Sequence, residues 1–361
     1  MAIFTDVFED VTKQGRKIPT NEYHESGLHP IIDQGQNEIA GYTDEVDGLF
    51  TDVPAIVFGD HTRVLKYVDT PCFLGADGVK LLKAKIDDPN YKYLYYALSN
   101  AKIPNTGYNR HFKWLKEVEI PLPAETVQQR IVDILDKLNE LTAMRKEQLA
   151  KLDQLVKARF VEMFGTENDF SRWSCCVVED VADVCVGVVI KPTQYYADKG
   201  IPAFRSLNIG EMRVKNCDWV YFTEEGHLKN QKSIIRENDV LVIRSGAPGT
   251  ACVATAEYAG YNAVDIIIAH PDNQKVNSVF LAAFTNMPHG MNQIRAKTGG
   301  AAQQHFNVGG YKAMHLMLPP LSLQNQFATF VEQTNKTKLT IQASLDKLEV
   351  MKKALMQEYL G

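Results

Sequence analysis

Residues 122–165 read LPAETVQQRIVDILDKLNELTAMRKEQLAKLDQLVKARFVEMFG, and residues 318–361 read LPPLSLQNQFATFVEQTNKTKLTIQASLDKLEVMKKALMQEYLG. A shift of 196 positions, without a gap, aligns the two stretches with 11 identities in 44 positions. Each copy opens on a Leu-Pro step and closes on a Gly. Self-similarity at a fixed period is the signature of a repeated architectural unit. The repeated stretch is therefore a whole structural element.

Both copies predict a long helix. In the first, apolar residues from Ile131 to Met163 recur at three- and four-residue steps, and in the second a strict seven-residue step runs from Phe327 to Leu355. Beyond the opening Leu-Pro step, neither helix contains an interior Pro or Gly. A helix of this length measures about 60 Å and cannot bury its narrow apolar seam alone. The two helices are therefore expected to pair with each other as an antiparallel coiled coil.

The regions before the two helices have a different sequence pattern. Short apolar runs such as Ala55–Phe58 and Asp239–Arg244 alternate with Gly, Pro, Asn and Asp turns. The fold class expected is α/β (α+β), with two mixed, mainly β domains separated by the two long helices and related by an internal pseudo-twofold repeat. The expected boundaries are 1–121, 122–165, 166–317 and 318–361. His111-Phe112 and His305-Phe306 are a fainter echo, each a little before its Leu-Pro step.

Composition limits the class of protein. The 361 residues are 45% hydrophobic and 23% charged, which suits two to three globular domains. No apolar run approaches the roughly 20 residues that span a bilayer, so a cytoplasmic location without membrane contact is expected. The net charge of −5 argues against simple electrostatic coating of nucleic acid but allows a local basic cleft. The six cysteines have neither Cys-x-x-Cys nor paired His spacing, and we expect reduced, structural thiols and no metal site.

Catalytic motifs are missing from the sequence. It has no phosphate-binding Gly-x-x-x-x-Gly-Lys-Ser/Thr loop, no Gly-x-Gly-x-x-Gly, no Gly-x-Ser-x-Gly and no His-Glu-x-x-His. Asp88-Pro-Asn-Tyr91 lacks the second Pro of an amino-methyltransferase loop, and Asp265 and Asp272 offer no nuclease-like pairing with a Lys. We therefore expect a chain that performs no chemistry by itself. The lone histidines His24, His29 and His289 are expected at turns, without a role.

Polar loops that follow apolar strands are the candidates for recognition. Direct readout of DNA uses Arg or Lys for guanine and Asn or Gln for adenine, with hydroxyl and backbone donors for phosphates. The same loops are also compatible with ordinary hairpin turns or a mobile surface loop. The candidate DNA-binding residues are Gln34, Gln36, Asp60, His61, Thr62, Arg63, Arg110, His111, Arg205, Ser206, Arg244, Ser245, Arg295, Lys297, Thr298, Gln303, Gln304 and His305.

One combination of motifs resembles a known family. Ile120-Pro-Leu-Pro123, Gln128-Gln-Arg-Ile131 and the long helix, repeated more loosely from Leu318, resemble the specificity subunit of type I restriction-modification enzymes. The resemblance implies a non-catalytic subunit whose two target-recognition domains each read one half of a split double-stranded DNA sequence, with the helices as a spacer. It also implies docking of two modification subunits and of restriction subunits, in a complex that uses S-adenosylmethionine, ATP and Mg, none of them bound by this chain.

The family pattern also suggests where partner subunits are bound. The candidate subunit-binding residues are Gln128, Arg130, Gln324 and Gln326. The second copy departs from the pattern, because Asn325-Gln326 replaces Gln129-Arg130 and its basic residue. Two alternatives remain open: a coiled-coil adaptor whose globular domains bind proteins, and the recognition part of a fused restriction enzyme. The two globular regions differ outside their boundaries, so an asymmetric target is expected.

Overall fold

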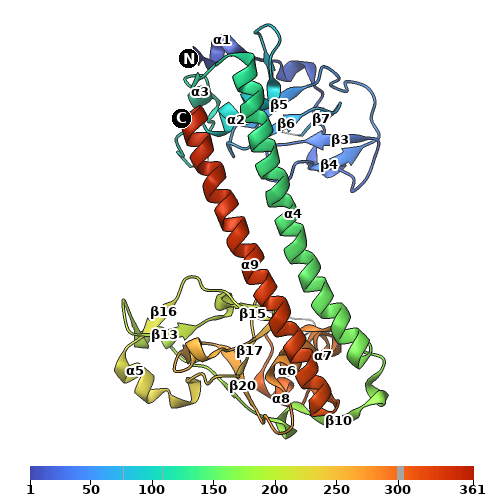
Figure 1. Cartoon of the computed structure of the whole chain (residues 1–361), viewed down its shortest axis with the longest axis vertical. Coiled ribbons are helices and arrows are strands. Elements are labelled where there is room, and N and C mark those ends of the chain that lie inside the picture. The colour runs from blue at the N-terminus through green and yellow to red at the C-terminus, as the bar shows by residue number, and fades with distance from the viewer. Residues whose placement is uncertain (76, 108, 299–304) are drawn as a thin grey trace. The chain divides into compact units, whose positions relative to one another are not determined.

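The computed structural model describes residues 1–75, 77–107, 109–298 and 305–361. The chain divides into two compact units, and each contains one globular domain and one half of each long helix. Unit 1 comprises Met1–Lys146 and Gln342–Gly361, and unit 2 comprises Glu147–Ile341. Figure 1 shows the elements of both units.

Unit 1 is built on a four-stranded antiparallel sheet in the order β2-β8-β5-β6, accompanied by a second sheet in the order β4-β3-β7 and a β1-β9 pair. Its elements are β1 (Ala2–Ile3), α1 (Phe4–Val7), β2 (Phe8–Asp10), β3 (His29–Ile32), β4 (Gly41–Thr43), β5 (Ala55–Gly59), β6 (Leu65–Val68), β7 (Phe73–Leu74), β8 (Val79–Ala84), α2 (Tyr91–Ser99), α3 (Phe112–Leu115), β9 (Glu119–Ile120) and the first part of α4 (Glu125–Phe164). The last part of α9 (Leu321–Leu360) completes it.

Unit 2 repeats this plan with additions. Its main sheet has the order β11-β20-β17-β18, and its second sheet has the order β12-β16-β13-β19. Its elements are β10 (Ser174–Val177), β11 (Ala182–Val186), β12 (Tyr196–Ala197), β13 (Ile201–Phe204), β14 (Ile209–Gly210), β15 (Arg213–Val214), β16 (Val220–Phe222), α5 (Glu224–Lys229), β17 (Val240–Ile243), β18 (Ala251–Val253), β19 (Asn262–Ala263), β20 (Ile266–Pro271), α6 (Ser278–Asn286), α7 (Pro288–Thr298), α8 (Val308–Lys312) and β21 (His315–Leu318). In both units the second sheet contains one parallel pair, β3 with β7 and β13 with β19.

The central strand of each main sheet is buried on both faces. Along β5, Ile56 and Phe58 enter the core beneath the helices, whereas Ala55 and Val57 enter a second core on the opposite face. Along β17, Val240 and Val242 point to one core and Leu241 and Ile243 to another. This is the two-residue alternation of a strand. It explains why both strands read as unbroken apolar runs in the sequence.

The two long helices pair antiparallel within each unit, as the heptad pattern predicts. In unit 1, Lys352 Nζ of α9 donates to Asn139 Oδ1 of α4 at 2.7 Å, and Leu135 and Leu360 share one core. In unit 2, Lys338 Nζ lies 2.5 Å from Asp153 Oδ1, and Phe160 packs edge-on against Phe327. The α4 position advances by 14 residues from Asn139 to Asp153, while its α9 partner moves back by 14 residues from Lys352 to Lys338. The two pairs therefore have the same antiparallel register.

Helix α4 ends at the Gly that closes the first repeat. Gly165 has φ +94°, a left-handed conformation that Gly adopts without the Cβ penalty, and its N–H donates to Val161 O at 2.8 Å. Among the described residues, no helix is both long and apolar enough to cross a membrane.

The predicted turn position of two histidines is wrong. His29 begins β3, and His289 lies in α7 with 2% of its surface exposed. The His289 ring is packed among the rings of Phe160, Phe170 and Phe284, at centroid distances of 5.4, 5.9 and 5.7 Å. Burial therefore lowers the pKa of His289. A polar residue in a turn-like sequence was in fact a core residue of unit 2.

Candidate nucleic-acid interface

The polar segment after β5 is fixed by two buried groups. Asp60 is 4% exposed, and its Oδ1 accepts a hydrogen bond from Phe112 N at 2.7 Å. The Asp60 carbonyl accepts from His111 N at 2.7 Å and from His111 Nδ1 at 3.0 Å. His111 is completely buried. The prediction that these two side chains contact DNA is corrected, because they join the end of β5 to α3 instead.

Three further candidate residues converge on the same strand end. Gln34 Oε1 accepts from His61 N at 3.2 Å, and Gln34 Nε2 donates to Asp77 O at 3.1 Å. Thr62 Oγ1 donates to Gln34 O at 2.6 Å. A Cβ on Gly59 would lie 2.2 Å from Thr62 Oγ1 and 2.9 Å from Gln34 Cβ, so Gly at this position allows the close approach of the two loops. The structure thus brings these candidate residues together, and their contact with DNA stays a prediction.

The remaining unit 1 candidates differ in whether their side chains already form hydrogen bonds inside the unit. Arg63 has a left-handed φ of 61°, and its Nη1 donates to Ile103 O at 3.2 Å. Gln36 and Arg110 are exposed, and neither forms a hydrogen bond or ion pair with another described residue. These two side chains are available to a ligand, and their contact with DNA stays a prediction.

In unit 2, the end of β17 carries a network around Arg244. Arg244 is 8% exposed, and its Nη1 lies 2.7 Å from Asp265 Oδ1. Its Nε donates to Phe306 O at 3.3 Å, and its Nη2 lies 2.5 Å from His305 Nε2. Three of its five N–H donors are engaged inside unit 2 and little of the residue is exposed, which argues against a bidentate contact with guanine. The prediction of direct base contact by Arg244 is therefore corrected to a role in positioning the loop.

The same network determines whether the Ser245 hydroxyl accepts or donates the hydrogen bond with His305. A guanidinium only donates, so His305 Nε2 must accept, and the neutral imidazole then carries its proton on Nδ1. Nδ1 lies 2.8 Å from Ser245 Oγ, which therefore accepts. The Ser245 hydroxyl hydrogen is left to point elsewhere, as a donor suited to a phosphate or base oxygen. His305 itself is exposed.

The two strand ends are built alike. In each unit, the His of a His-Phe step returns to the end of the central strand, His111 to Asp60 and His305 to Ser245. The partners of the two His rings differ: His111 Nδ1 contacts the Asp60 carbonyl, whereas His305 contacts the Arg244 guanidinium and the Ser245 hydroxyl. A shared scaffold thus presents two chemically different surfaces.

The segment predicted as the densest recognition loop is partly helical. Arg295, Lys297 and Thr298 belong to α7, where Thr298 is 8% exposed and donates to Ile294 O at 3.1 Å. Thr298 is therefore corrected from a DNA contact to a helix-internal group. Lys297 Nζ donates to Gly310 O at 2.9 Å and to Ala313 O at 3.3 Å, which suits the carbonyl end of α8.

Arg295 is exposed and unpaired within the described part of the chain, so it remains a candidate for a phosphate or base. Gln303 and Gln304 lie outside the described residues. Arg205 is half-buried and donates through Nη2 to Asp218 O, while Ser206 opens a short 3-10 turn. Arg205 is thus partly committed, and contact of Ser206 with DNA stays a prediction.

The sequence prediction missed several charged groups near the strand ends. The Lys66 side chain is 2% exposed and lies 3.3 Å from Asp33 Oδ1, with Nζ donating to Asn37 O at 2.5 Å. Exposed Lys113 and Lys116 follow the His-Phe step, and their ammonium groups lie 4.7 Å from the Trp114 ring and 5.0 Å from the Phe112 ring. These lysines belong to no recognised motif, although the alternation of Lys with aromatic residues is a sequence signal that could have predicted them.

The glutamines of the repeated motif start the long helices. Gln128 Nε2 donates to Pro123 O at 2.9 Å, and Gln324 Nε2 donates to Pro319 O at 2.8 Å. Gln324 is completely buried and also accepts from Asn277 N at 2.8 Å. Its predicted contact with a partner subunit is corrected, because the side chain is satisfied inside unit 2. Arg130 and Gln326 are exposed, and their partner contacts stay predictions.

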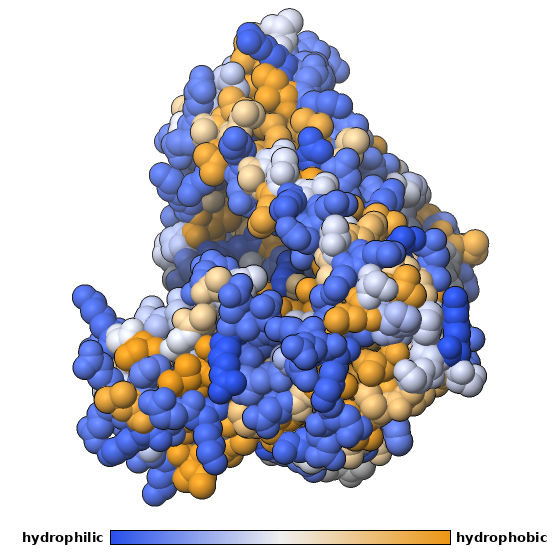
Figure 2. All heavy atoms as spheres, turned by 60° about the horizontal axis from the view of Figure 1, so that its bottom comes forward, coloured by the Kyte–Doolittle hydropathy of each residue, from blue (hydrophilic) through white to orange (hydrophobic). Residues whose placement is uncertain are grey.

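Hydrophilic side chains cover most of the face shown in Figure 2, with small apolar areas between them. Within the described ranges, no group of three or more His, Cys, Asp or Glu side chains is arranged to hold a metal ion. The exposed candidates Gln36, Arg110 and Arg295 carry amide or guanidinium donors.

Comparison with known proteins identifies the family. Residues 4–154 and 173–350 match the family described as type I restriction modification DNA specificity domain. The chain belongs to this family.

Individual relatives agree with this assignment. The chain is 26% identical to the type I restriction enzyme EcoR124I/EcoR124II specificity subunit of Escherichia coli, over 63% of this chain and 60% of that protein. The match thus spans less than two thirds of that relative. The fold is similar to the crystal structure of the type I restriction-modification S subunit from M. genitalium, with TM-score 0.59, 16% identity, and coverage of 99% and 95% of the two chains. A structure titled for complex assembly and conformational transition of the type I R-M system gives TM-score 0.56, 14% identity and the same coverage.

Proposed function

We propose that this specificity-domain protein reads a bipartite, asymmetric DNA target, one half-site with each unit, as the non-catalytic subunit of a type I restriction-modification enzyme. One observation carries the proposal. The two units share strand order, the His-Phe return and the Gln helix start, yet differ in the residues displayed at the central strand end. Like scaffolds with unlike surfaces suit two readers of different sequences.

The partner subunits follow from the same proposal. Two modification subunits would dock on the paired helices and supply S-adenosylmethionine and the methyl transfer to adenine, and restriction subunits would bring the ATP- and Mg-dependent activity. The exposed residues Arg130 and Gln326 are the helix positions we assign to docking. Specific DNA affinity would largely be realised in the complex, because a chain of net charge −5 releases few counterions by itself.

The test uses one exposed arginine from each unit. Arg110→Ala in unit 1 and Arg295→Ala in unit 2 are expressed with the modification subunits, and adenine methylation is mapped across the genome by single-molecule sequencing. Each variant is expected to relax or lose specificity at one half-site and to leave the other unchanged, because each arginine lies in a different unit. Loss of one base-specific contact typically costs about 1–3 kcal/mol.

Two controls separate the proposal from its rival. Lys199→Ala changes an exposed cation in the loop between β12 and β13, outside the paired helices and outside both strand ends, and should leave the target sequence unchanged. Assembly of each variant with the modification subunits is measured by size-exclusion chromatography. Intact assembly with an unchanged methylation pattern in both Arg variants would favour the alternative, a coiled-coil adaptor whose globular domains bind proteins.

A further inference from the structure

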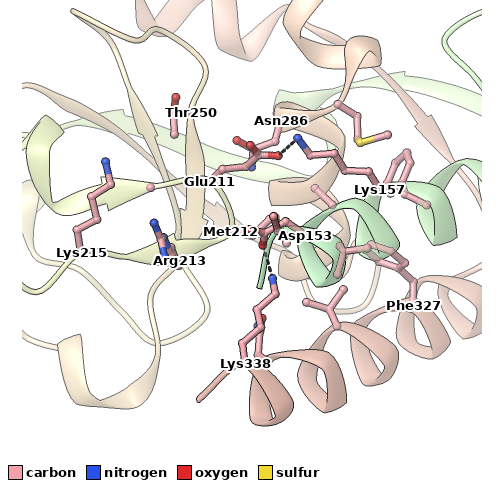
Figure 3. A pocket seen from close by; sticks show the side chains of 18 residues that line it. Asp153, Lys157, Glu211, Met212, Arg213, Lys215, Thr250, Asn286, Phe327 and Lys338 are labelled. Atoms are coloured by element: carbon pink, nitrogen blue, oxygen red, sulfur yellow. Dashed lines mark hydrogen bonds and ion pairs between the residues drawn. The ribbon is translucent and has the colours of Figure 1, made fainter. Parts of the chain in front are cut away.

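Unit 2 contains a cavity of about 380 Å³ between its helices and the β14-β15 hairpin. Figure 3 shows the side chains that line it. Its floor is apolar and includes Phe160 of α4, Phe327 and Val331 of α9, and Met287 after α6. The volume lies within the range of about 300–1,000 Å³ that is common for small-molecule sites, which are typically apolar with a few placed polar groups.

The internal repeat explains why this cavity exists. Helices α2 and α6 are both nine residues long and start after a capping Asn, Asn90 or Asn277. The sixth residue is Tyr96 in α2 and Ala283 in α6. In unit 1, the Tyr96 hydroxyl reaches α4, where it donates to Asp136 Oδ1 at 2.5 Å and accepts from Asn139 Nδ2 at 2.8 Å.

Unit 2 has no tyrosine ring at the matching place. Asn335, which aligns with Asn139 in the repeat, lines the cavity beside Ala283. Replacing a large side chain by a small one in a packed region leaves unfilled volume unless the surroundings collapse. Here Ala283 and Asn335 form the wall of an open cavity, so one copy of the repeat has a space that the other copy fills.

The charges at the cavity are unbalanced. Lys157 Nζ lies 2.8 Å from Glu211 Oε1, and Lys338 Nζ lies 2.5 Å from Asp153 Oδ1, so these two lysines are paired, as the dashed lines in Figure 3 show. Arg213 and Lys215 also line the cavity, and neither has an ion-pair partner among the residues that the structure describes. The lining therefore carries two cations without counter-charge above an apolar floor.

We propose that this cavity binds a small organic anion, with a compact apolar body against Phe160, Phe327 and Val331 and a carboxylate or phosphate at Arg213 and Lys215. Charge-assisted hydrogen bonds from Arg and Lys are the usual means of holding either anion. Such a ligand touches the β14-β15 hairpin, α4 and α9 at once, so it stabilises unit 2 by an amount that rises with the logarithm of its concentration over its dissociation constant.

The probe is 1-anilinonaphthalene-8-sulfonate, which joins an aromatic body to one anionic group and fluoresces when transferred from water to an apolar site. Titration into the full chain is expected to show saturable binding to one class of site. Arg213→Ala combined with Lys215→Ala should weaken this binding by about tenfold or more. Lys199→Ala removes an exposed Lys from the loop between β12 and β13 of unit 2 and should leave this binding unchanged.

Ala283→Tyr installs the side chain that closes the matching space in unit 1 and should abolish the saturable signal. Circular dichroism reports whether this variant folds, and Ala283→Met, with its more adaptable side chain, gives the same test if it does not. Absence of saturable binding to the wild-type chain, or wild-type affinity in the folded filled variant, overturns the proposal.

Competition identifies the anion. Displacement of the probe by octanoate supports a carboxylate ligand, and displacement by adenosine monophosphate supports a phosphate ligand. In either case the uncharged counterparts octanol and adenosine should compete about tenfold less well, because they leave Arg213 and Lys215 without a partner. Displacement by a modification subunit but by neither anion would assign the cavity to a protein segment and overturn the proposal.

Discussion

The two motif glutamines should differ sharply in their contribution to stability, although they occupy the same position of the repeat. Gln324→Ala in unit 2 removes a donor to Pro319 O and an acceptor for Asn277 N from a fully buried side chain. Gln128→Ala in unit 1 removes only the donor to Pro123 O from a half-buried side chain. The two substitutions are chemically identical, so the surroundings decide the outcome.

The expected magnitudes follow from the groups left without partners. A buried donor or acceptor that loses its partner costs about 1–3 kcal/mol, so two of them, one half-buried, put Gln324→Ala at about 3 kcal/mol. The Pro123 carbonyl is within reach of water, so Gln128→Ala should cost about 0.5–1 kcal/mol, the net value of one hydrogen bond. Gln326→Ala, in the same turn as Gln324 but exposed, should stay within about 0.5 kcal/mol of wild type.

Urea denaturation followed by tryptophan fluorescence can measure each unit by itself. Trp114 is in unit 1, whereas Trp173 and Trp219 are in unit 2. A Trp114→Phe background therefore reports unit 2, and it removes an indole N–H that is buried and has no acceptor among the described residues. A background with Trp173→Phe and Trp219→Phe reports unit 1.

With a urea slope of about 2–3 kcal/mol per molar, Gln324→Ala should lower the unit 2 midpoint by about 1 M, and Gln128→Ala should lower the unit 1 midpoint by about 0.3 M. Equal shifts, or a larger shift for Gln128→Ala, would refute the argument that burial of the satisfied amide determines the cost. A large shift for Gln326→Ala would instead indicate that this turn of α9 is sensitive to any substitution.

Three further predictions follow from charged and paired groups. Asp239, 2.6 Å from His270 Nδ1, raises the pKa of His270 from 6.5 to about 9, so the stabilisation is complete below about pH 6.5 and is lost as pH rises through about 9. The loss should be about 2 kcal/mol after allowance for solvent screening, visible as a falling urea midpoint between pH 6 and pH 9.5 that is smaller in His270→Gln. Burial lowers the pKa of Lys352, so Lys352→Met should leave thermal stability unchanged or raise it. Asn139→Ala leaves the Lys352 ammonium without its acceptor and should lower the free energy of unfolding by about 1–3 kcal/mol. A larger loss of stability for Lys352→Met than for Asn139→Ala would contradict this reasoning. Deleting 146–152 together with 339–345 removes facing heptads and shortens each helix by about 10 Å. The methylated target should then lose about 3 base pairs between its half-sites and keep the half-site sequences. An unchanged spacer would show that the helices do not determine the distance between the half-sites.

The fold was largely readable from the sequence because its main features are periodic. The seven-residue step from Phe327 to Leu355 and the apolar steps from Ile131 onward place the buried faces of α9 and α4 correctly, since amphipathic spacing alone determines which side of a helix is buried. The unbroken apolar runs at β5 and β17 predicted strands, and the structure places both strands inside their main sheets. The burial of His289 could not be predicted in this way, because two of the three phenylalanine rings around it, Phe160 and Phe170, come from distant parts of the sequence of unit 2.

The candidate site was predicted at the level of loops but not of side chains. The strand ends do gather Gln34, Thr62, Ser245 and His305. The sequence could not show that Asp60, His111 and Arg244 face inward, because their partners lie about 20 to 60 positions away and include backbone groups that carry no sequence signal. Polar residue type was therefore a poor guide to which side chains remain available to DNA.

The repeat makes it possible to test experimentally which side chains stabilise a unit and which are available to DNA, because positions of one unit have matching positions in the other. Tyr96 and Ala283, or Gln128 and Gln324, occupy matching positions with different surroundings, so a substitution in one copy has a natural control in the other. Residues that serve the shared scaffold should change the stability of their own unit by an amount that their burial sets, whereas residues that read DNA should change one half-site and leave stability unchanged. A variant such as Arg295→Ala that altered both half-sites would therefore have to act through the scaffold, and its unfolding midpoint would reveal this directly.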